Sequence, residues 1–312
     1  MTTDKDKLQA LRREIDVIDD SIHDLIMERT RVVERVRIAK RSDRIKIRPA
    51  REAEILYRLM ARHQGPFPKQ ELARIWREMI VATLRFEGPF SVAVAAPEDE
   101  AGYWDLARDQ FGTFTPMTRH VSFRGVVEAV CNQDATVGIL PMPRPDDEQR
   151  WWPLMVSEAP DTPRVIARLP FIPWDPGRGS GTEALVICAV GQEKTGRDHS
   201  FLAVEAEEDI GFGVIESALD QAGLSAVFHQ LWHDPNRPAA WIYLVEISTF
   251  IDVEGRRMQR LMDGLGQRVK RVVHLGGYAT PLDAADMEQE KIANARGAPG
   301  VQDGAKDGAG DG

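Results

Sequence analysis

The chain has little of what marks secreted, metal-binding or membrane-spanning proteins. Its 312 residues include two cysteines, Cys131 and Cys188, which are too few for a disulfide framework and are not spaced as metal ligands. The N-terminus is charged from Asp4 onward, unlike a signal peptide, and no apolar run reaches the length of a bilayer span. We therefore expect a cytoplasmic protein of two or three domains, in which both cysteines are buried small apolar residues.

The chain also lacks the basic tail and the aromatic platforms that are typical of nucleic-acid-binding proteins. Residues 1–88 contain 20 Lys and Arg against 15 Asp and Glu, a net charge of +5. The whole chain has a net charge of −9, so residues 89–312 carry a net charge of −14. A basic segment joined to an acidic one can indicate a nucleic-acid partner. Here the cations alternate with acids along predicted helices, so we expect neither a nucleic-acid partner nor a membrane partner.

Residues 8–40 are predicted to form one long helix with an apolar seam. The seam residues recur three and four apart, the spacing of a helix that packs against other helices: Leu8, Leu11, Ile15, Ile18, Ile22, Leu25, Val32, Val36 and Ala39. Arg29 falls inside this seam, where a guanidinium is costly unless an anion meets it. Pairing with a core carboxylate, or snorkelling out of a loosely packed bundle, would also explain it.

Two further cations belong to the same helix. Lys40 follows Arg29 by about 16 Å along the axis and lies on nearly the same face, so the two could hold a small anion between them. Arg12 lies about 25 Å from Arg29 and about 42 Å from Lys40, too far to join them within one chain. If Arg12 serves such a site, a second, antiparallel copy of the helix must supply it. The spacing then predicts a dimer with shared sites.

Two shorter helices aim further polar groups inward. A helix from Pro49 to about His63 places Glu52 in line with apolar residues. The third helix, about 69–87, has an apolar stripe that ends in a hydroxyl and a carboxylate: Leu72, Ile75, Trp76, Met79, Ile80, Thr83 and Glu87. Polar groups that converge in an apolar bundle favour a binding site for a small dianion with a hydroxyl over a plain core.

Residues 8–88 resemble the all-α chorismate mutase family of the small intertwined dimer type. The resemblance rests on LQALRREIDVIDDSIHDLIMERTRVVERVRIAK, on RPAREAEIL and on the third helix. It implies the following roles: Arg12 of the partner chain and Arg29 hold the two carboxylates, Arg51 lies close to the ligand, Lys40 and Glu87 hydrogen-bond the ether oxygen, Glu52 meets the ring hydroxyl, and Thr83 lies near the ring carboxylate.

Two positions depart from the family pattern. Arg48 stands where many members carry an aspartate, and Glu87 stands where a glutamine is frequent. The implied reaction is the Claisen rearrangement of chorismate to prephenate in phenylalanine and tyrosine biosynthesis, which needs no nucleophile, metal or redox cofactor. Bound cations would hold the substrate in its compact conformer, and Lys40 with a protonated Glu87 would stabilise charge on the ether oxygen.

The segment 90–195 has an α/β pattern. Strands are expected at 91–96, 135–141, 164–171 and 184–190, and helices at 100–111 and 126–133. The order resembles one lobe of a prephenate dehydratase domain, as in bifunctional chorismate mutase/prephenate dehydratases. The motifs depart from that family at APEDEAGYW (96–104) and LPMPRP (140–145), and the length fits one lobe where two are needed. We therefore expect a degenerate domain without dehydratase activity.

The segment 199–283 shows the order βαββαβ of a ferredoxin-like unit. Its strands are FLAVEA, the hairpin of SAVFHQLW and AAWIYLVEIS, and VKRVVHLGG, with helices at 211–223 and about 254–265. It resembles an ACT domain, in which Gly211 agrees with the first ligand-loop motif and HQLW (229–232) departs from the second. From about Ala284 the chain is rich in Gly, Ala, Asp and Glu, which predicts a disordered tail.

The prediction is thus a multidomain protein. Residues 1–88 form an all-α, three-helix chorismate mutase domain, 90–195 a degenerate prephenate dehydratase-like α/β domain, 199–283 an ACT-like domain and 284–312 a disordered tail. The expected function is that of a chorismate mutase, a homodimer without cofactor or metal. The alternatives are a working bifunctional chorismate mutase/prephenate dehydratase and a non-catalytic regulatory subunit.

Overall fold

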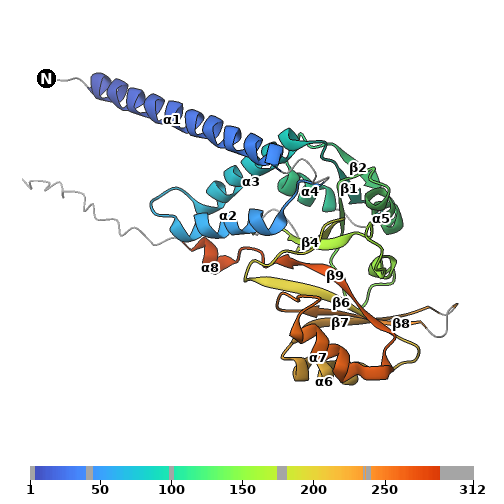
Figure 1. Cartoon of the computed structure of the whole chain (residues 1–312). Helices are drawn as coiled ribbons and strands as arrows, with labels where there is room; N and C mark the ends of the chain where they lie inside the picture. Colours follow the sequence, from blue (N-terminus) through green and yellow to red (C-terminus); the bar gives the residue numbers. More distant parts are fainter. Residues whose placement is uncertain are drawn as a thin grey trace, which may run out of the picture.

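Three helices open the chain. The computed structural model describes residues 4–39, 45–97, 102–173, 181–234, 236 and 240–288. The helices are α1 (Asp4–Ala39), α2 (Pro49–Arg62) and α3 (Lys69–Glu87), as the sequence predicted. The predicted end of the first helix, Lys40, lies outside the described residues. Helix α1 projects from the body of the molecule as a long rod (Figure 1).

The apolar seam of α1 is uncovered in the single chain. No residue of this helix is buried. The seam residues are 43% to 63% exposed: Leu8, Leu11, Ile15, Ile18, Ile22, Leu25, Val32 and Val36. A helix with this much apolar surface is typical of a protein interface.

Helices α2 and α3 pack against each other and against the C-terminal half of the chain. Leu56 of α2 and Ala73 of α3 are fully buried. They belong to one apolar cluster with Phe171 and Leu282, which come from far along the sequence. The predicted stripe of α3 is partly wrong, because Ile75 is 48% exposed. The buried face is rotated toward α2 and the sheet, and its residues are Ala73, Arg77, Ile80, Val81 and Leu84.

The described strands form one nine-stranded sheet in the order β2-β1-β3-β5-β4-β9-β6-β8-β7. Their bounds are β1 (Val92–Ala95), β2 (Met117–His120), β3 (Val137–Pro141), β4 (Arg164–Leu169), β5 (Ala184–Cys188), β6 (Asp198–Ala206), β7 (Ala226–His233), β8 (Trp241–Ile247) and β9 (Arg271–Ala279). Strand β1 is parallel to β2 and β3. Strand β4 is parallel to β9, where Val165 pairs with Gly276 and joins the two predicted C-terminal units into one sheet.

Helices cover both faces of this sheet. Helix α5 (Phe123–Cys131) and the turn η1 (Trp152–Met155) lie on one face, and α4 (Tyr103–Phe111), α6 (Phe212–Ala222) and α7 (Arg256–Leu265) lie on the other. A second turn, η2 (Gly266–Arg268), follows α7. Successive side chains of strand β6 point to opposite faces of the sheet, as in any strand. Phe201 belongs to the cluster on one face and Leu202 to the cluster on the other. No described helix is both long and apolar enough to cross a membrane.

The element order β6-α6-β7-β8-α7-β9 agrees with the predicted βαββαβ unit. Its strands lie side by side in the order β9-β6-β8-β7. The sequence analysis missed β2, whose residues MTRH are partly exposed at the sheet edge and show no apolar alternation. The strands of the 90–195 segment otherwise lie where they were predicted.

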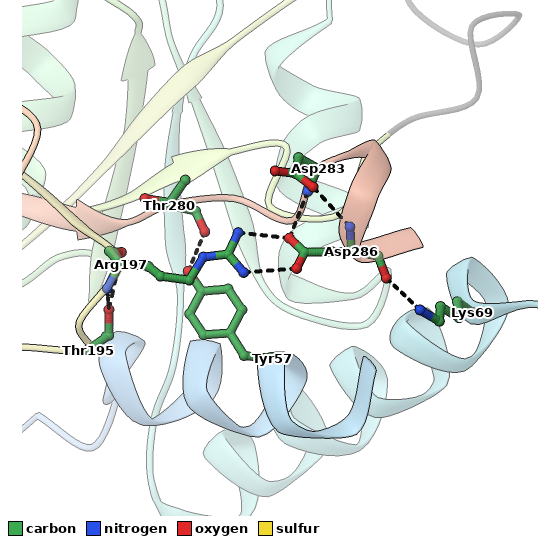
Figure 2. A network of polar contacts seen from close by, with 7 residues as sticks. All are labelled: Tyr57, Lys69, Thr195, Arg197, Thr280, Asp283 and Asp286. Atoms are coloured by element: carbon green, nitrogen blue, oxygen red, sulfur yellow. Dashed lines mark hydrogen bonds and ion pairs between the residues drawn. The ribbon is translucent and has the colours of Figure 1, made fainter. Parts of the chain in front are cut away.

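A short helix, α8 (Ala284–Met287), corrects the predicted start of the tail. Asp283 and Asp286 form a capping box that begins this helix. The Asp286 carboxylate accepts hydrogen bonds from both terminal nitrogens of Arg197, at 2.9 and 2.8 Å. Its carbonyl accepts one from Lys69 Nζ of α3 at 2.9 Å (Figure 2). These contacts order residues 284–287, whereas 289–312 lie outside the described residues.

The same network attaches α2 to the sheet. The Tyr57 hydroxyl of α2 donates to the Thr280 carbonyl just after β9. The Arg197 guanidinium lies 4.4 Å from the centre of the Tyr57 ring, a cation–π contact seen in Figure 2. Through Lys69 and Tyr57, the two helices that line the site described below are held against the C-terminal half of the chain.

Candidate functional site

The three N-terminal helices enclose a hollow of about 180 Å³. It is lined by most of the predicted site residues, together with two cations that precede α2: Arg29, Arg51, Glu52, Thr83 and Glu87, with Lys46 and Arg48. Its apolar walls come from α1, α2 and α3, including Val36, Ile55 and Ile80. The structure thus brings the predicted polar residues Arg29, Arg51, Glu52, Thr83 and Glu87 together around one hollow.

Arg29 points from α1 toward α3. Its terminal nitrogen donates to the Thr83 hydroxyl at 3.0 Å, and that hydroxyl donates to the Met79 carbonyl at 2.6 Å. The guanidinium also lies 5.9 Å from the ring centre of Trp76. Partial burial lowers the pKa of Arg29 from its ordinary value, and the nearby Glu87 carboxylate opposes this shift. Because it is positioned and partly desolvated, this cation is suited to binding a carboxylate.

Glu52 is buried and has a partner that the sequence analysis did not find. Its Oε2 accepts a hydrogen bond from Arg77 at 2.8 Å, and both side chains are nearly inaccessible. Its Oε1 is buried without a hydrogen-bond partner among the described residues. A buried carboxylate oxygen left in this state is costly, so a donor on a bound ligand would be stabilised there.

A clue to Arg77 was present in the sequence. It follows Ala73 by four residues and precedes Ile80 by three and Leu84 by seven, the spacing of a buried helix face. The reasoning that identified Arg29 inside an apolar seam applies equally to Arg77. The apolar stripe predicted from the sequence lies on a neighbouring face of α3, and this face does not include Arg77.

The remaining predicted residues differ in position. Thr83 and Glu87 lie one turn apart at the end of α3, and both are half-buried. Arg51 lines the hollow but is exposed, and it pairs with Glu54 at 3.1 Å. Arg12 is exposed near the far end of α1 and does not line this hollow within one chain.

Two lining cations were not predicted as site residues. Lys46 and Arg48 lie in the segment that leads into α2. Arg48, which the sequence analysis noted only as a departure from the family, pairs with Glu193 of the α/β region at 3.4 Å. The hollow thus combines cations, a hydroxyl and a buried carboxylate oxygen, which is the chemistry that recognises a small hydroxylated carboxylate.

Relatives in other organisms match the N-terminal part of the chain. A "Bifunctional chorismate mutase/prephenate dehydratase" of Stutzerimonas stutzeri is 40% identical over 102 residues, which is 31% of this chain and 28% of that protein. The protein of the same name from Pseudomonas aeruginosa is 37% identical over 101 residues, which is 30% of this chain and 28% of that protein. That from Aquifex aeolicus is 31% identical over 142 residues, covering 44% and 39%. The chain therefore spans well under half the length of these relatives.

Solved structures show only a distant likeness. The prephenate dehydratase from Streptococcus mutans has a TM-score of 0.45 and 11% identity, covering 62% of this chain and all (100%) of that one. A structure titled "GqqA- a novel type of quorum quenching acylases" also has a TM-score of 0.45, with 15% identity and coverage of 62% and 95%.

The family comparison concerns the segment that contains the hollow. Residues 11–88 match the family model named chorismate mutase type II. This range includes Arg29, Glu52, Thr83 and Glu87, which the structure gathers around the hollow. Residues 11–88 are therefore similar to the chorismate mutase type II family.

Proposed function

We propose that this protein is a chorismate mutase that converts chorismate to prephenate. The observation that carries the proposal is the convergence of Arg29, Glu52, Thr83 and Glu87 on one hollow within the family-matched segment. The rearrangement is intramolecular, so the protein must hold the substrate in its reactive conformer and stabilise the charge that develops. The lining residues are of the types that these two tasks need.

The binding part of the mechanism begins with fixed charges. Arg29 is positioned by Thr83 and binds one substrate carboxylate. The carboxylate takes the place of the water that burial has removed from the guanidinium. Glu52 Oε1 accepts a hydrogen bond from the ring hydroxyl of the substrate, while Arg77 fixes Glu52 through Oε2. Both contacts restrict a flexible dianion to one orientation.

The chemical part depends on donors at the ether oxygen, where negative charge builds as the C–O bond breaks. Glu87 can donate only when it is protonated, whereas an amide at this position always offers an N–H. We therefore expect Glu87→Gln to stay active and to lose most of the decline in kcat at alkaline pH. Glu87→Ala should be poor at every pH. A kcat profile of Glu87→Gln that equals that of the parent would contradict this role.

Lys40 is proposed as the second donor, although it lies outside the described residues. Its ammonium supplies a charge that does not depend on Glu87, so Lys40→Ala should lower kcat more than Glu87→Ala does. A Lys40→Ala variant that retains most of the parent activity would exclude lysine from this step.

We further propose a homodimer in which two antiparallel copies of α1 cross. The exposed seam of α1 supports this, because each fully buried Ile or Leu contributes about 1.5–3 kcal/mol. Such a copy would bring Arg12 to the hollow of its partner. Arg12→Ala and Arg29→Ala, each inactive alone, should then regain partial activity when they are refolded together. Absence of recovery in verified heterodimers would contradict shared sites.

The experiment that tests the main proposal follows the loss of chorismate absorbance with the purified full-length protein. Arg29→Ala should lower kcat/KM at least about a hundredfold, because it removes a charge-assisted contact in a desolvated site. Arg31→Ala, on the same helix but exposed, is the matched control. Absence of turnover by the parent protein would refute the proposal and favour a non-catalytic subunit.

The names of the relatives make a bifunctional enzyme the second candidate. We propose that residues 90–195 are a degenerate dehydratase-like region without this activity. Prephenate incubated with the protein at neutral pH should then give no phenylpyruvate above the uncatalysed background. Formation of phenylpyruvate in proportion to protein concentration would establish the bifunctional enzyme instead.

We also propose that residues 199–283 are an ACT-like domain of a cytoplasmic enzyme. Support comes from the βαββαβ order and from Gly211, which has a φ of +69° at the start of α6. Because the second ligand-loop motif is missing, phenylalanine should inhibit the mutase weakly or not at all. Tight phenylalanine binding in calorimetry, coupled to loss of mutase activity, would contradict this.

A further inference from the structure

A second cavity lies where strand β6 begins, in the C-terminal half of the chain. It has a volume of about 340 Å³, which is within the usual range of small-molecule sites. Its walls come from the segment around the start of β6, from the residues that follow β8 and β9, and from the first turn of α7. It shares no lining residue with the hollow between the three N-terminal helices, so the proposed mutase reaction does not use it.

Positive charge dominates this cavity. The Lys, Arg, Asp and Glu residues that line it are three cations and one acid: Lys194, Arg197, Arg257 and Asp198. The Asp198 carboxylate is buried and already accepts hydrogen bonds from the Thr195 hydroxyl and the Gly196 amide, both at 2.8 Å. Residues 89–312 carry a net charge of −14, whereas the cavity has a net charge of +2 with His199 neutral. In an acidic part of the chain, the cavity therefore attracts small anions.

Two of the lining cations are available to a ligand. Within the described part of the chain, neither Lys194 nor Arg257 makes a hydrogen bond or an ion pair. The side-chain hydroxyls of Ser248 and Thr249 also line the cavity, and they make no hydrogen bond to the described residues either. An ammonium, a guanidinium and two hydroxyls that line one cavity are the donors that bind an oxyanion, such as a phosphate or a carboxylate group.

The first turn of α7 adds to the positive potential at this cavity. The N-terminal end of a helix carries a partial positive charge, so acidic residues are favoured there and cations are disfavoured. Helix α7 has no acidic residue in its first turn and no side-chain cap, and it begins with Arg256 and Arg257. A bound anion would offset the cost of two adjacent arginines at this end of the helix.

Arg197 contributes charge to the cavity but few free donors. Both of its terminal nitrogens donate to Asp286, and its guanidinium lies 4.4 Å from the centre of the Tyr57 ring of α2 (Figure 2). The direct contacts to a ligand are therefore assigned to Lys194 and Arg257. An anion held by them would lie beside the network that attaches α2 to the sheet.

The cavity is distinct from the ligand loop that the resemblance to an ACT domain implies at Gly211. Gly211 follows the end of β6, whereas the cavity lies at the beginning of this strand. Strand β6 has nine residues, so at about 3.3 Å per residue the two places are about 26 Å apart. A ligand in the cavity would therefore not reach the Gly211 loop.

We propose that this cavity binds the oxyanion group of a small phosphorylated or carboxylated metabolite. Lys194 and Arg257 hold the charge, and the Ser248 and Thr249 hydroxyls donate to the remaining oxygens. The proposal does not depend on the proposed mutase function, because the two sites share no residue.

The test is calorimetric titration of the full-length protein at constant ionic strength, with inorganic phosphate and, separately, with malonate. We expect saturable binding of at least one of these probes, and the tighter of the two tells whether the site prefers a phosphate or a carboxylate group. Lys194→Gln and Arg257→Gln should each raise Kd about three- to tenfold, because each removes a charged but partly solvated contact. Binding should be lost in the double variant. Both side chains are exposed, so the melting temperature without a probe should stay unchanged.

Two controls locate the binding. Arg260→Gln changes an exposed cation of α7 that does not line the cavity, and its Kd should equal that of the parent. Arg29→Ala changes the separate hollow and should leave this binding unchanged. Absence of saturable binding of both probes would overturn the inference. Binding that the double variant retains, or that Arg29→Ala abolishes, would overturn it as well, whatever the chorismate assay shows.

Discussion

The first helix and the last βαββαβ unit use apolar residues in opposite ways. Helix α1 has 36 residues and buries none of them. The unit from β6 to β9 encloses its own core, in which Leu202, Ile215, Tyr243 and Leu261 are all at most 2% exposed. The apolar pattern is strong in both regions, so hydrophobic periodicity alone does not tell whether a segment is stable within its own chain.

The difference lies in where the covering surface comes from. In the βαββαβ unit, α6 and α7 follow strands of the same sheet and pack back onto it. Helix α1 contacts α3 near Arg29 and Thr83, and most of its length extends beyond the rest of the chain (Figure 1). A long amphipathic helix that stays folded in water generally has a partner. The four variants below test this contrast, from the largest expected effect to the smallest.

Ile22→Glu should have the largest effect. Ile22 is 51% exposed in the single chain and lies in the middle of the seam. In a dimer, each copy would lose about 1.5–3 kcal/mol of burial and would also bury a charge. We expect dissociation in sedimentation equilibrium and at least a hundredfold loss of mutase activity. His23→Glu, one residue off the seam, should leave the dimer intact, and an unchanged dimer in Ile22→Glu would contradict an interface at this seam.

Leu261→Ala should affect stability without affecting assembly. Leu261 of α7 is fully buried in the core of the βαββαβ unit. Truncation of a buried leucine generally costs about 2–5 kcal/mol. Urea unfolding should show this loss, while the oligomeric state stays unchanged. Arg260→Ala, its exposed neighbour, should cost less than about 0.5 kcal/mol. If Leu261→Ala also lost less than about 0.5 kcal/mol of unfolding free energy, the βαββαβ unit would not enclose a core of its own.

His274 should make the βαββαβ unit sensitive to acid. Burial, assisted by the charge of Arg164, lowers the pKa of His274 to about 4. The unfolded chain binds this proton near pH 6.5, so between pH 6.5 and 4 the unfolded state holds more protons and stability falls as pH falls. The upper bound is about 3 kcal/mol. In His274→Gln, the unfolding free energy should therefore differ less between pH 7 and pH 5 than it does in the parent protein. A difference equal to that of the parent would contradict this role of His274.

Asp286→Asn should have the smallest effect, because its ion pair with Arg197 is partly exposed. Such pairs contribute about 0.2–1 kcal/mol. The hydrogen bond from Arg197 holds the pKa of Asp286 below its usual range, so the contribution should disappear as falling pH protonates this carboxyl. Thermal unfolding at pH 7 should show a small loss relative to Glu288→Gln. Equal melting temperatures would show that this pair does not hold α2 and α3 to the sheet.

Local patterns were sufficient for most helices and for part of the candidate site. The three N-terminal helices end close to their predicted residues, because proline, glycine and the apolar period mark them. Arg29 and Glu52 were recognised as inward-facing because a charge inside an apolar stripe is visible in the sequence. The roles of Arg12 and Lys40 stay predictions, since one lies far from the hollow and the other lies outside the described residues.

Contacts between distant segments were not predictable in this way. Arg77 was missed because the buried face of α3 depends on Phe171 and Leu282, which pack beside it from more than eighty residues away. The sequence predicts a disordered tail where α8 forms, because the order of this helix depends on Arg197 and Lys69, and neither residue is near it in sequence. The pairing of β4 with β9 likewise joins two units that the sequence presents separately.

The amino-acid sequence by itself therefore determined the type of most elements and the chemical character of the hollow between the three N-terminal helices. Periodicity and charge spacing act over a few residues, and the chain records them directly. Packing selected the partner of Glu52 and the continuous sheet. Each of these depends on which surfaces meet after the chain has folded, because burial and desolvation are set by neighbours from elsewhere in the sequence.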